Sequence, residues 1–371
     1  MMMTHKQRIL AASRKQPVDK LPFGARIDLW YNYNKVHGTL PEKYRGLDMV
    51  DILRDLGAGI RQRHEYIWKE TFRNVEIVDS DAPPYRTTEY RTPKGNVTRK
   101  VVFTQEEGTV AAYETEHMFK SAEDYAPIEY LIENTVLTID QDKYLKAVQR
   151  VGEDGLVHVR ASQSPMQEVM RKFMGFERFF FELADHRSQV EHLYEVTKEL
   201  VWKKLKILAE SPTEHVQVDG NWSDDIHTPV FRKYFVPYFR EAVDYVHSKG
   251  KVTMVHMDGE VRRLIPMFLE TGIDMAEAFC PAPMTSVTTA DLRKAWGDRV
   301  VVWGGMPAIL FEPQYSDEEF DAYVRKLFKE IAPGNAFIVG MGDNVPFDGN
   351  IERVGRIVEL IDECGQLPIK A

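Results

Sequence analysis

Three apolar runs in the second half of the sequence end in side chains that can bind a metal ion or move a proton. The candidates are Asp219, His256, Asp258, Glu277 and Cys280. A borderline-soft cation such as zinc accepts imidazole, thiolate and carboxylate ligands together, and a catalytic zinc site keeps one position open. The pattern therefore favours a zinc site in which His256 and Cys280 are joined by one or two of the three carboxylates.

Each of these residues also has a purely structural interpretation. A histidine near the end of a strand can be held by ordinary hydrogen bonds, and a lone cysteine is often a small buried apolar side chain. Glu277 would fit a salt bridge at the edge of a sheet. The spacing of His256, Glu277 and Cys280 alone leaves both interpretations open.

Further side chains beside the apolar runs are candidates to bind a substrate. They are Arg26, Asp28, Trp30, Trp222, Met306 and Asp343. The Arg26 guanidinium could pair with a carboxylate or carbonyl of the substrate, or it could form an internal ion pair with Asp28 or Asp343. The two tryptophans could wall an aromatic pocket, although packing in the core is an equally good interpretation.

The apolar runs alternate with helical patterns, which is the rhythm of parallel βαβ units. Seven strands are predicted: Leu21–Leu29, Leu156–Ala161, His215–Asp219, Val252–His256, Asp274–Phe279, Val300–Trp303 and Ala336–Met341. An eighth strand is expected in the weakly patterned stretch 107–145. Eight such strands would close a (β/α)8 TIM barrel, in which catalytic groups lie at the carboxyl ends of the strands.

The main alternative is an open doubly wound sheet. That fold would usually show a glycine-rich phosphate loop after its first strand. Gly24 is isolated, so the sequence favours the barrel, as a single domain spanning residues 1–371.

Residues 73–115 depart from this rhythm. Val75–Val78, Thr87–Arg91 and Val97–Thr104 alternate, and the stretch Thr92–Asn96 reads as a turn between the last two runs. We therefore expect a β-hairpin insertion within the barrel, after its N-terminal strand.

Composition and charge narrow the class of protein. The 371 residues include 48 Lys and Arg against 57 Asp and Glu, a net charge of −9, and they show no basic patch for nucleic acid. No apolar run approaches the ~20 residues of a membrane span. The N-terminus lacks the apolar core of a secretory signal, and two cysteines cannot build a disulfide framework. These features predict a cytoplasmic protein with neither a membrane nor a nucleic acid as partner, and they leave a homodimer open.

The order of several short segments resembles the uroporphyrinogen decarboxylase superfamily, which includes decarboxylases and cobalamin-dependent methyltransferases. The resemblance covers nearly the whole chain and implies a (β/α)8 barrel. The segments are Thr4–Ala12 with Pro17–Pro22, Ser164-Pro165 with Phe173–Gly175, Val255–Gly259 with Thr271–Asp274, and Trp303–Pro307.

The same resemblance separates the two branches of the superfamily. The decarboxylases carry two arginines near the first strand that hold substrate carboxylates, and only Arg26 matches, because Trp30 stands at the second position. The methyltransferases bind zinc through His-x-Cys and a distant Cys. Here His256 matches, whereas Asp258 and Gly342 stand at the two cysteine positions. The stretch from Glu277 to Pro283 is similar to members that demethylate methoxylated aromatics.

This resemblance implies an O-demethylating methyltransferase. It would move a methyl group from a small methylated donor, such as a methoxylated aromatic, to the Co(I) corrinoid of a partner protein. His256, Glu277 and Cys280 would hold zinc as a Lewis acid, and Asp219 and Asp258 would orient groups or deliver a proton. Arg26, Asp28, Trp30, Trp222, Met306 and Asp343 would form the donor pocket. The chain contains no DxHxxG cobalamin-binding motif, so the corrinoid would belong to another protein.

The sequence leaves two alternative functions open. The first is a cofactor-independent decarboxylase of a small carboxylic acid, in which Arg26 binds the carboxylate and Asp219 or His256 manages the proton. The second is a non-catalytic barrel that binds a corrinoid or tetrapyrrole partner. The number of polar groups at strand ends disfavours a mere scaffold, and tightly bound metal would disfavour the decarboxylase.

Overall fold

In the computed structural model, the chain is described over residues 2–104, 111–160 and 162–370 and divides into two compact units. The first unit joins the residues up to Glu65 with Asp142–Arg160 and with the residues from Pro212 onward. The second joins Tyr66–Gln141 with the described residues of 162–211. Every residue proposed above as a metal ligand, proton carrier or substrate contact belongs to the first unit.

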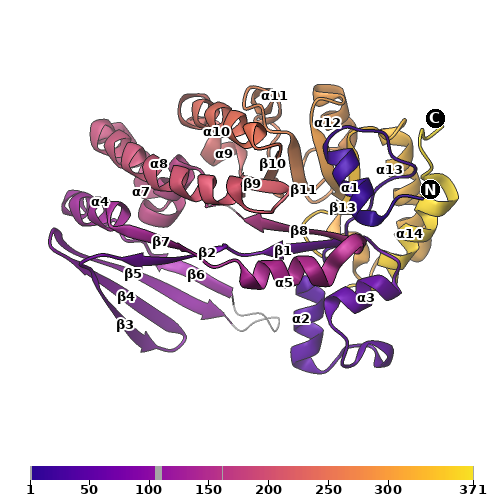
Figure 1. Cartoon of the computed structure of the whole chain (residues 1–371), viewed down its shortest axis with the longest axis horizontal. Coiled ribbons are helices and arrows are strands. Elements are labelled where there is room, and N and C mark those ends of the chain that lie inside the picture. The colour runs from indigo at the N-terminus through magenta and orange to yellow at the C-terminus, as the bar shows by residue number, and fades with distance from the viewer. Residues whose placement is uncertain (1, 105–110, 161, 371) are drawn as a thin grey trace. The chain divides into compact units, whose positions relative to one another are not determined.

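A seven-stranded parallel sheet organises the first unit (Figure 1). Its order is β1-β8-β9-β10-β11-β12-β13. The strands are β1 (Ile60–His64), β8 (Gly155–Arg160), β9 (His215–Gly220), β10 (Val252–His256), β11 (Met275–Phe279), β12 (Val301–Met306) and β13 (Phe337–Met341). Every residue of β9 to β13 is buried, as expected for parallel strands covered on both faces.

Six of the predicted strands correspond to β8 to β13. The prediction for Val252–His256 matches β10 at both ends, and the other five differ by a few residues. The last residue of the predicted strand 156–161 lies outside the described residues.

The predicted location of the additional strand was wrong. That strand is β1, with the sequence Ile-Arg-Gln-Arg-His, and it pairs in parallel with β8. Three charged or polar residues in a row, followed by histidine, hide it from any search for apolar runs. Within the stretch 107–145, residues 107–110 lie outside the described part, and Thr135–Ile139 forms β7, which pairs antiparallel with β2.

The predicted first strand Leu21–Leu29 is much shorter than expected. Phe23 forms an isolated parallel bridge to Val339 of β13, and Ala25 forms another to Ile60 of β1. The Gly24 N–H donates to the Val339 oxygen at 3.1 Å. Residues 23–25, which we call the bridging segment, thus bond to both edge strands of the sheet, and helix α2 begins directly afterwards at Asp28.

Helices alternate with the strands of the first unit. They are α1 (His5–Ser13), α2 (Asp28–His37), α3 (Met49–Asp55), α5 (Asp142–Val151), α9 (Asp224–His227), α10 (Val236–Ser248), α11 (Ile265–Phe268), α12 (Thr289–Trp296), α13 (Asp317–Ile331) and α14 (Glu352–Cys364). Capping boxes begin α1 at Thr4 and α13 at Ser316. A buried apolar cluster that includes Met254, Met275 and Trp303 fills the space between the strands.

The second unit contains antiparallel sheet and helices. Its four-stranded sheet has the order β3 (Glu76–Ala82), β4 (Tyr85–Thr92), β5 (Gly95–Thr104) and β6 (Ala111–Glu116). A separate pair joins β2 (Trp68–Phe72) to β7 (Thr135–Ile139), and the helices are α4 (Tyr125–Glu133), α6 (Pro165–Gln167), α7 (Phe176–Asp185) and α8 (Arg187–Glu210).

The predicted hairpin in residues 73–115 is part of this larger sheet. The turn is confirmed, because Thr92 pairs with Gly95 across it. Two more strands extend the hairpin on its two sides, and residues 105–110 within the predicted range lie outside the described part.

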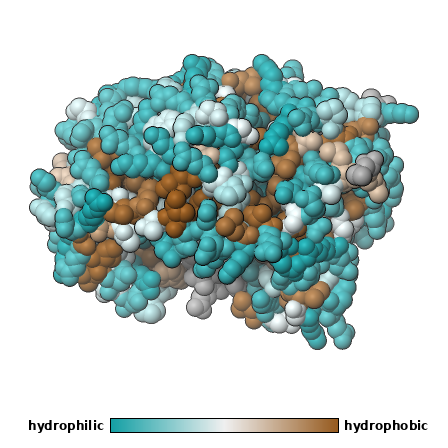
Figure 2. Space-filling view, viewed as in Figure 1, coloured by the Kyte–Doolittle hydropathy of each residue, from teal (hydrophilic) through white to brown (hydrophobic). Residues whose placement is uncertain are grey.

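The surface drawn in Figure 2 is mostly hydrophilic, with hydrophobic residues in smaller groups. Among the described residues, no helix combines the length and the apolar character that crossing a membrane would require.

Gly59 tests the contact between the bridging segment and β1. A Cβ at position 59 would lie 2.1 Å from the Phe23 oxygen, so Gly59→Ala must push the backbones apart. We expect it to lower the free energy of unfolding by about 1–3 kcal/mol, measured by urea denaturation. Gly355→Ala is the matched control, because its Cβ would meet Leu56 at an ordinary 3.5 Å. Equal stability of the two variants would contradict the close approach.

Candidate active site

His256, the last residue of β10, is buried and faces three carboxylates. Its Nδ1 lies 2.8 Å from Oε2 of Glu277, which is its register partner on β11. Its Nε2 lies 3.4 Å from Oδ2 of Asp258 and 3.3 Å from Oδ1 of Asp343, which follows β13. Carboxylates only accept hydrogen bonds. When Nδ1–H donates to Glu277, Nε2 is left facing the carboxylates of Asp258 and Asp343.

Glu277 is 0% exposed, and its charge is balanced by an equally hidden arginine. Arg61 of β1 forms an ion pair with Glu277 Oε1, while Oε2 contacts His256. The Arg61 guanidinium also lies 5.8 Å from the ring centre of Trp303. Burial, followed by the charge of Arg26, lowers the pKa of Arg61 to about 9, so the guanidinium still carries its charge at neutral pH.

Arg26 connects Asp343 to a fourth carboxylate, that of Asp28. Its Nε and Nη2 donate to the two oxygens of Asp28 at 2.8 and 3.0 Å, and its Nη1 donates to Asp343 Oδ1. Burial opposes the charge of Arg26, but Asp28 and Asp343 outweigh it and raise the Arg26 pKa. Burial would also raise the pKa of Asp343, yet His256 and Arg26 hold it well below its usual value.

His256, Asp258 and Asp343 form a group that could hold a metal ion. Among the described residues it is the group in which three such side chains offer ligand atoms within 4.8 Å of one another. Two ligands bound to a tetrahedral zinc at 2.0–2.2 Å lie roughly 3.3–3.6 Å apart. The 3.3 and 3.4 Å separations from His256 Nε2 to the two carboxylates fit that spacing.

Asp219 is placed beside this group by the end of β9. Its Oδ1 accepts a hydrogen bond from the Gly220 N–H at 2.9 Å, and its Oδ2 accepts one from the Trp222 indole at 3.1 Å. Asn221, between them, has a φ of 60° and directs its amide to the Asp258 oxygens at 3.3 and 3.4 Å. Asp219 therefore orients the loop after β9, and Asn221 orients Asp258.

The structure groups the candidate ligands differently from the sequence prediction. Glu277 is engaged on both oxygens by Arg61 and His256. Cys280 donates its S–H to the Met284 sulfur at 3.5 Å, and burial, with the charges of Asp258 and Asp343, raises the pKa of its thiol to about 12. The arrangement thus presents Cys280 as a neutral thiol outside the group of three.

Three predicted substrate contacts are buried side chains. Trp222 is 1% exposed and packs against the rings of Phe231, Phe235, Phe239 and Phe268. Trp30 makes an edge contact with Tyr44 at 6.5 Å between ring centres. Met306 is 0% exposed at the end of β12. Their surroundings fit the core-packing interpretation, and their role in binding a substrate stays a prediction.

Sequence reasoning missed Arg61, on which the charge of Glu277 depends. The local signal is weak: Arg61 and Arg63 alternate with Gln62 and His64, which places both arginines on one face of a strand. Nothing in that alternation indicates that Arg61 is buried or that its partner lies 216 positions further along the chain (277 − 61).

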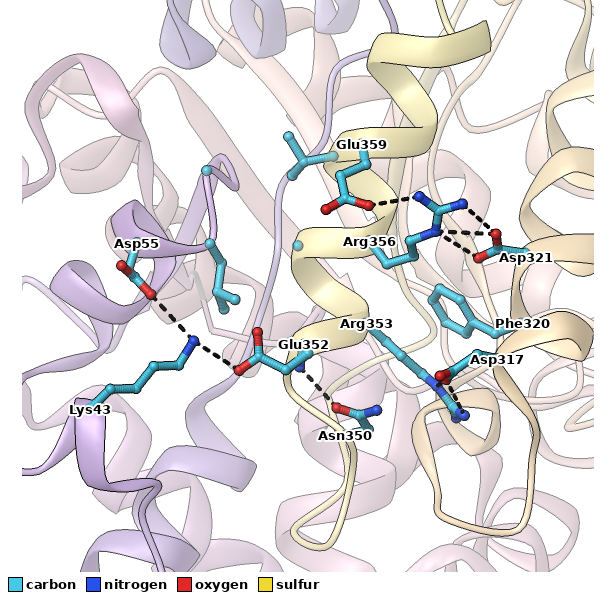
Figure 3. A pocket seen from close by; sticks show the side chains of 14 residues that line it. Lys43, Asp55, Asp317, Phe320, Asp321, Asn350, Glu352, Arg353, Arg356 and Glu359 are labelled. Atoms are coloured by element: carbon cyan, nitrogen blue, oxygen red, sulfur yellow. Dashed lines mark hydrogen bonds and ion pairs between the residues drawn. The ribbon is translucent and has the colours of Figure 1, made fainter.

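A cavity of about 560 Å³ lies elsewhere in the first unit, along α14. None of the predicted site residues lines it. Figure 3 shows that its charged side chains pair with one another. The pairs are Lys43–Glu352, Arg353–Asp317, Arg356–Asp321 and Arg356–Glu359. These ion pairs form a network that connects α13 and α14 with Lys43.

Comparison with known families identifies the fold. The sequence model of the family described as uroporphyrinogen decarboxylase (URO-D) matches residues 158–364, more than half of the chain. The chain belongs to the URO-D family. The family match includes His256, Asp258, Glu277 and Asp343, whereas Arg26 and Arg61, which balance their charges, lie before its first residue.

Comparison with solved structures agrees with this family assignment. A structure described as a methyltransferase from Methanosarcina mazei has a TM-score of 0.61 and 15% sequence identity, covering 97% of this chain and 99% of that chain. At this identity the likeness shows a shared fold. Comparison with curated proteins finds no match.

The Arg61–Glu277 pair generates a prediction about stability. Removing one member of a buried ion pair leaves an uncompensated charge, so Glu277→Leu should cost about 3–5 kcal/mol of unfolding free energy. The double variant Arg61→Met/Glu277→Leu should cost clearly less than the single one. Urea denaturation of both single variants and the double variant gives the coupling energy, and additive effects would contradict a direct pair.

Proposed function

We propose that this URO-D family member is a corrinoid-dependent methyltransferase. It moves a methyl group from a small methylated donor, a methoxylated aromatic in particular, to the Co(I) corrinoid of a partner protein, with zinc as Lewis acid. The observation that carries the proposal is the group of His256, Asp258 and Asp343, whose histidine is held from behind by buried Glu277.

The proposed architecture is a closed (β/α)8 barrel. The bridging segment bonds to β13 through Phe23 and to β1 through Ala25, which would make it the eighth member of the ring. Catalytic groups of such barrels lie at the carboxyl ends of the strands. His256 ends β10, and Asp258 and Asp343 follow β10 and β13, which agrees with that placement.

Charge balance supports a divalent cation in the group of three. Glu277, Asp258, Asp343 and Asp28 contribute four carboxylates, while Arg26 and Arg61 contribute two guanidiniums, so two negative charges remain. Two of these carboxylates, Asp258 and Asp343, face His256 Nε2. Zinc bound there would polarise the oxygen that leaves when the methyl group is transferred.

The residues of this chain have separate tasks in that reaction. Glu277 accepts from Nδ1 of His256 and fixes the ring so that Nε2 faces the cation. Arg61 keeps Glu277 charged, and Arg26 orients Asp343. Because Co(I) is itself the nucleophile, the remaining task is to hold the methyl carbon in line with it.

The donor set favours an oxygen leaving group. One imidazole and two carboxylates donate less charge to a metal than thiolates do, so the cation remains a stronger Lewis acid. Polarising an ether oxygen, from which a phenolate departs, needs that strength. Cys280, as a neutral thiol hydrogen-bonded to Met284, is not used in this proposal.

Methyl transfer is compatible with the fold that the chain shares with its structural neighbour. The structural neighbour from Methanosarcina mazei is described as a methyltransferase, and the match covers 99% of that chain. A cobalamin-binding partner, a cytoplasmic location, a single folded domain and a homodimer stay predictions from the sequence.

The decarboxylase alternative is less well supported. In that alternative Arg26 would bind the carboxylate of the substrate, but its guanidinium already donates hydrogen bonds to Asp28 and Asp343.

Metal analysis tests the proposal. Full-length protein purified without a chelator and supplied with zinc should contain about one zinc per chain by mass spectrometry. His256→Ala and Asp343→Ala should lose it, and the matched control Cys280→Ala should keep it. The zinc-loaded protein should then demethylate a methoxylated aromatic when a Co(I) corrinoid is supplied.

The outcomes separate the two candidate reactions. Absence of zinc from the wild type, or zinc lost from Cys280→Ala but kept in Asp343→Ala, would contradict the proposed ligand set. Absence of metal combined with release of carbon dioxide from a small carboxylic acid would move the assignment to the decarboxylase.

A further inference from the structure

A cavity of about 460 Å³ in the first unit is lined in part by Arg26 and Arg61, which also contact the carboxylates around His256. Its apolar lining residues are Ile27, Tyr31, Met49, Val50, Leu53 and Ile60. Its charged lining residues are Arg26, Arg61, Arg63 and Arg150, together with Asp28, Asp48 and Glu65. Its volume lies within the range of pockets for small molecules, and its wall combines apolar surface with positive charge.

Arg63 differs from the other arginines of this cavity. Arg26 pairs with Asp28 and Asp343, Arg61 with Glu277, and Arg150 with Asp48 and Asp51. The Arg63 guanidinium forms no ion pair or hydrogen bond with the residues that the structure describes, and its Nε is buried.

The surroundings of Arg63 make its lack of a partner costly. Burial, followed by the positive charges of Arg160 and Arg26, lowers its pKa, and the nearby carboxylate of Glu65 counteracts this only in part. A partly buried guanidinium without an anion loses hydration and gains no ion pair in return. An anionic group of a ligand would restore both the hydrogen bonds and the charge balance.

Two side chains connect this cavity to the His256 group. Arg26 lines the cavity and bonds to Asp343, and Arg61 lines the cavity and bonds to Glu277, which holds His256. Arg26 and Arg61 therefore join the wall of the cavity to the proposed metal ligands.

We propose that this cavity binds a small amphipathic carboxylate, with Arg63 pairing with the carboxylate and the apolar wall holding the hydrocarbon part. The inference rests on the proposed function, since it assigns the methyl donor to methoxylated aromatic acids rather than to neutral methoxyarenes. Planar carboxylate matches the fork of one guanidinium. Asp28, Asp48 and Glu65 in the same wall disfavour a dianion such as phosphate.

Calorimetric titration of the zinc-loaded full chain tests the proposal without any methyl acceptor. The probes are 3-methoxybenzoate, its neutral analogue 3-methoxybenzamide, and inorganic phosphate. The benzoate should bind at least about 10-fold more tightly than the amide, because a charge-assisted contact is worth ~1.5–3 kcal/mol. Phosphate should compete poorly.

Variants assign the effect to one side chain. Arg63→Gln should weaken binding of the benzoate by about 10–100-fold and leave binding of the amide unchanged. Arg63→Lys should recover part of the loss. The matched control is Arg54→Gln on α3, which removes a charge that is already paired with Asp154 and does not line the cavity. It should bind the benzoate as the wild type does.

Three results would overturn the proposal: equal affinity for benzoate and amide, equal weakening of both by Arg63→Gln, or phosphate binding as tightly as benzoate. The titration also separates this inference from the proposed function. Benzoate binding that depends on Arg63 without methyl transfer would leave the anion site standing and reject the methyltransferase. Transfer from neutral methoxyarenes, independent of Arg63, would do the reverse.

Discussion

The buried ion pair between Arg61 and Glu277 is the interaction on which the site depends. A fully buried carboxylate stays charged only if a neighbouring group balances it, and Arg61 from the far edge of the sheet does so. The Glu277 carboxylate then accepts a hydrogen bond from His256 Nδ1, and His256 Nε2 faces Asp258 and Asp343. The orientation of the His256 imidazole therefore depends, through Glu277, on an arginine almost two hundred residues earlier in the chain.

The order of the strands makes this pairing available. β1 and the bridging segment bring Arg61 and Arg26 from the N-terminal part to the strands that carry His256, Glu277 and Asp343. The anionic groups thus come from the second half of the chain, within the region that matches the family, and the cationic groups come from before it.

The sequence predicts the strands with apolar runs well, because buried parallel strands are continuously hydrophobic. It also predicts His256, Asp258, Glu277 and Asp343 as polar residues near strand ends. It does not predict β1, whose charged residues resemble a loop, nor the pairing of Arg61 with Glu277. Its prediction of Glu277 and Cys280 as ligands rests on spacing, which carries no information about the ion pair of Glu277 with Arg61 or the contact of the Cys280 thiol with Met284.

X-ray absorption at the zinc edge of the metal-loaded full chain tests the central claim most directly. We expect a coordination shell of nitrogen and oxygen at about 2.0–2.2 Å, with no sulfur at about 2.3 Å, and an unchanged spectrum in Cys280→Ser. A sulfur contribution in the wild type that disappears in Cys280→Ser would contradict it and return Cys280 to the metal.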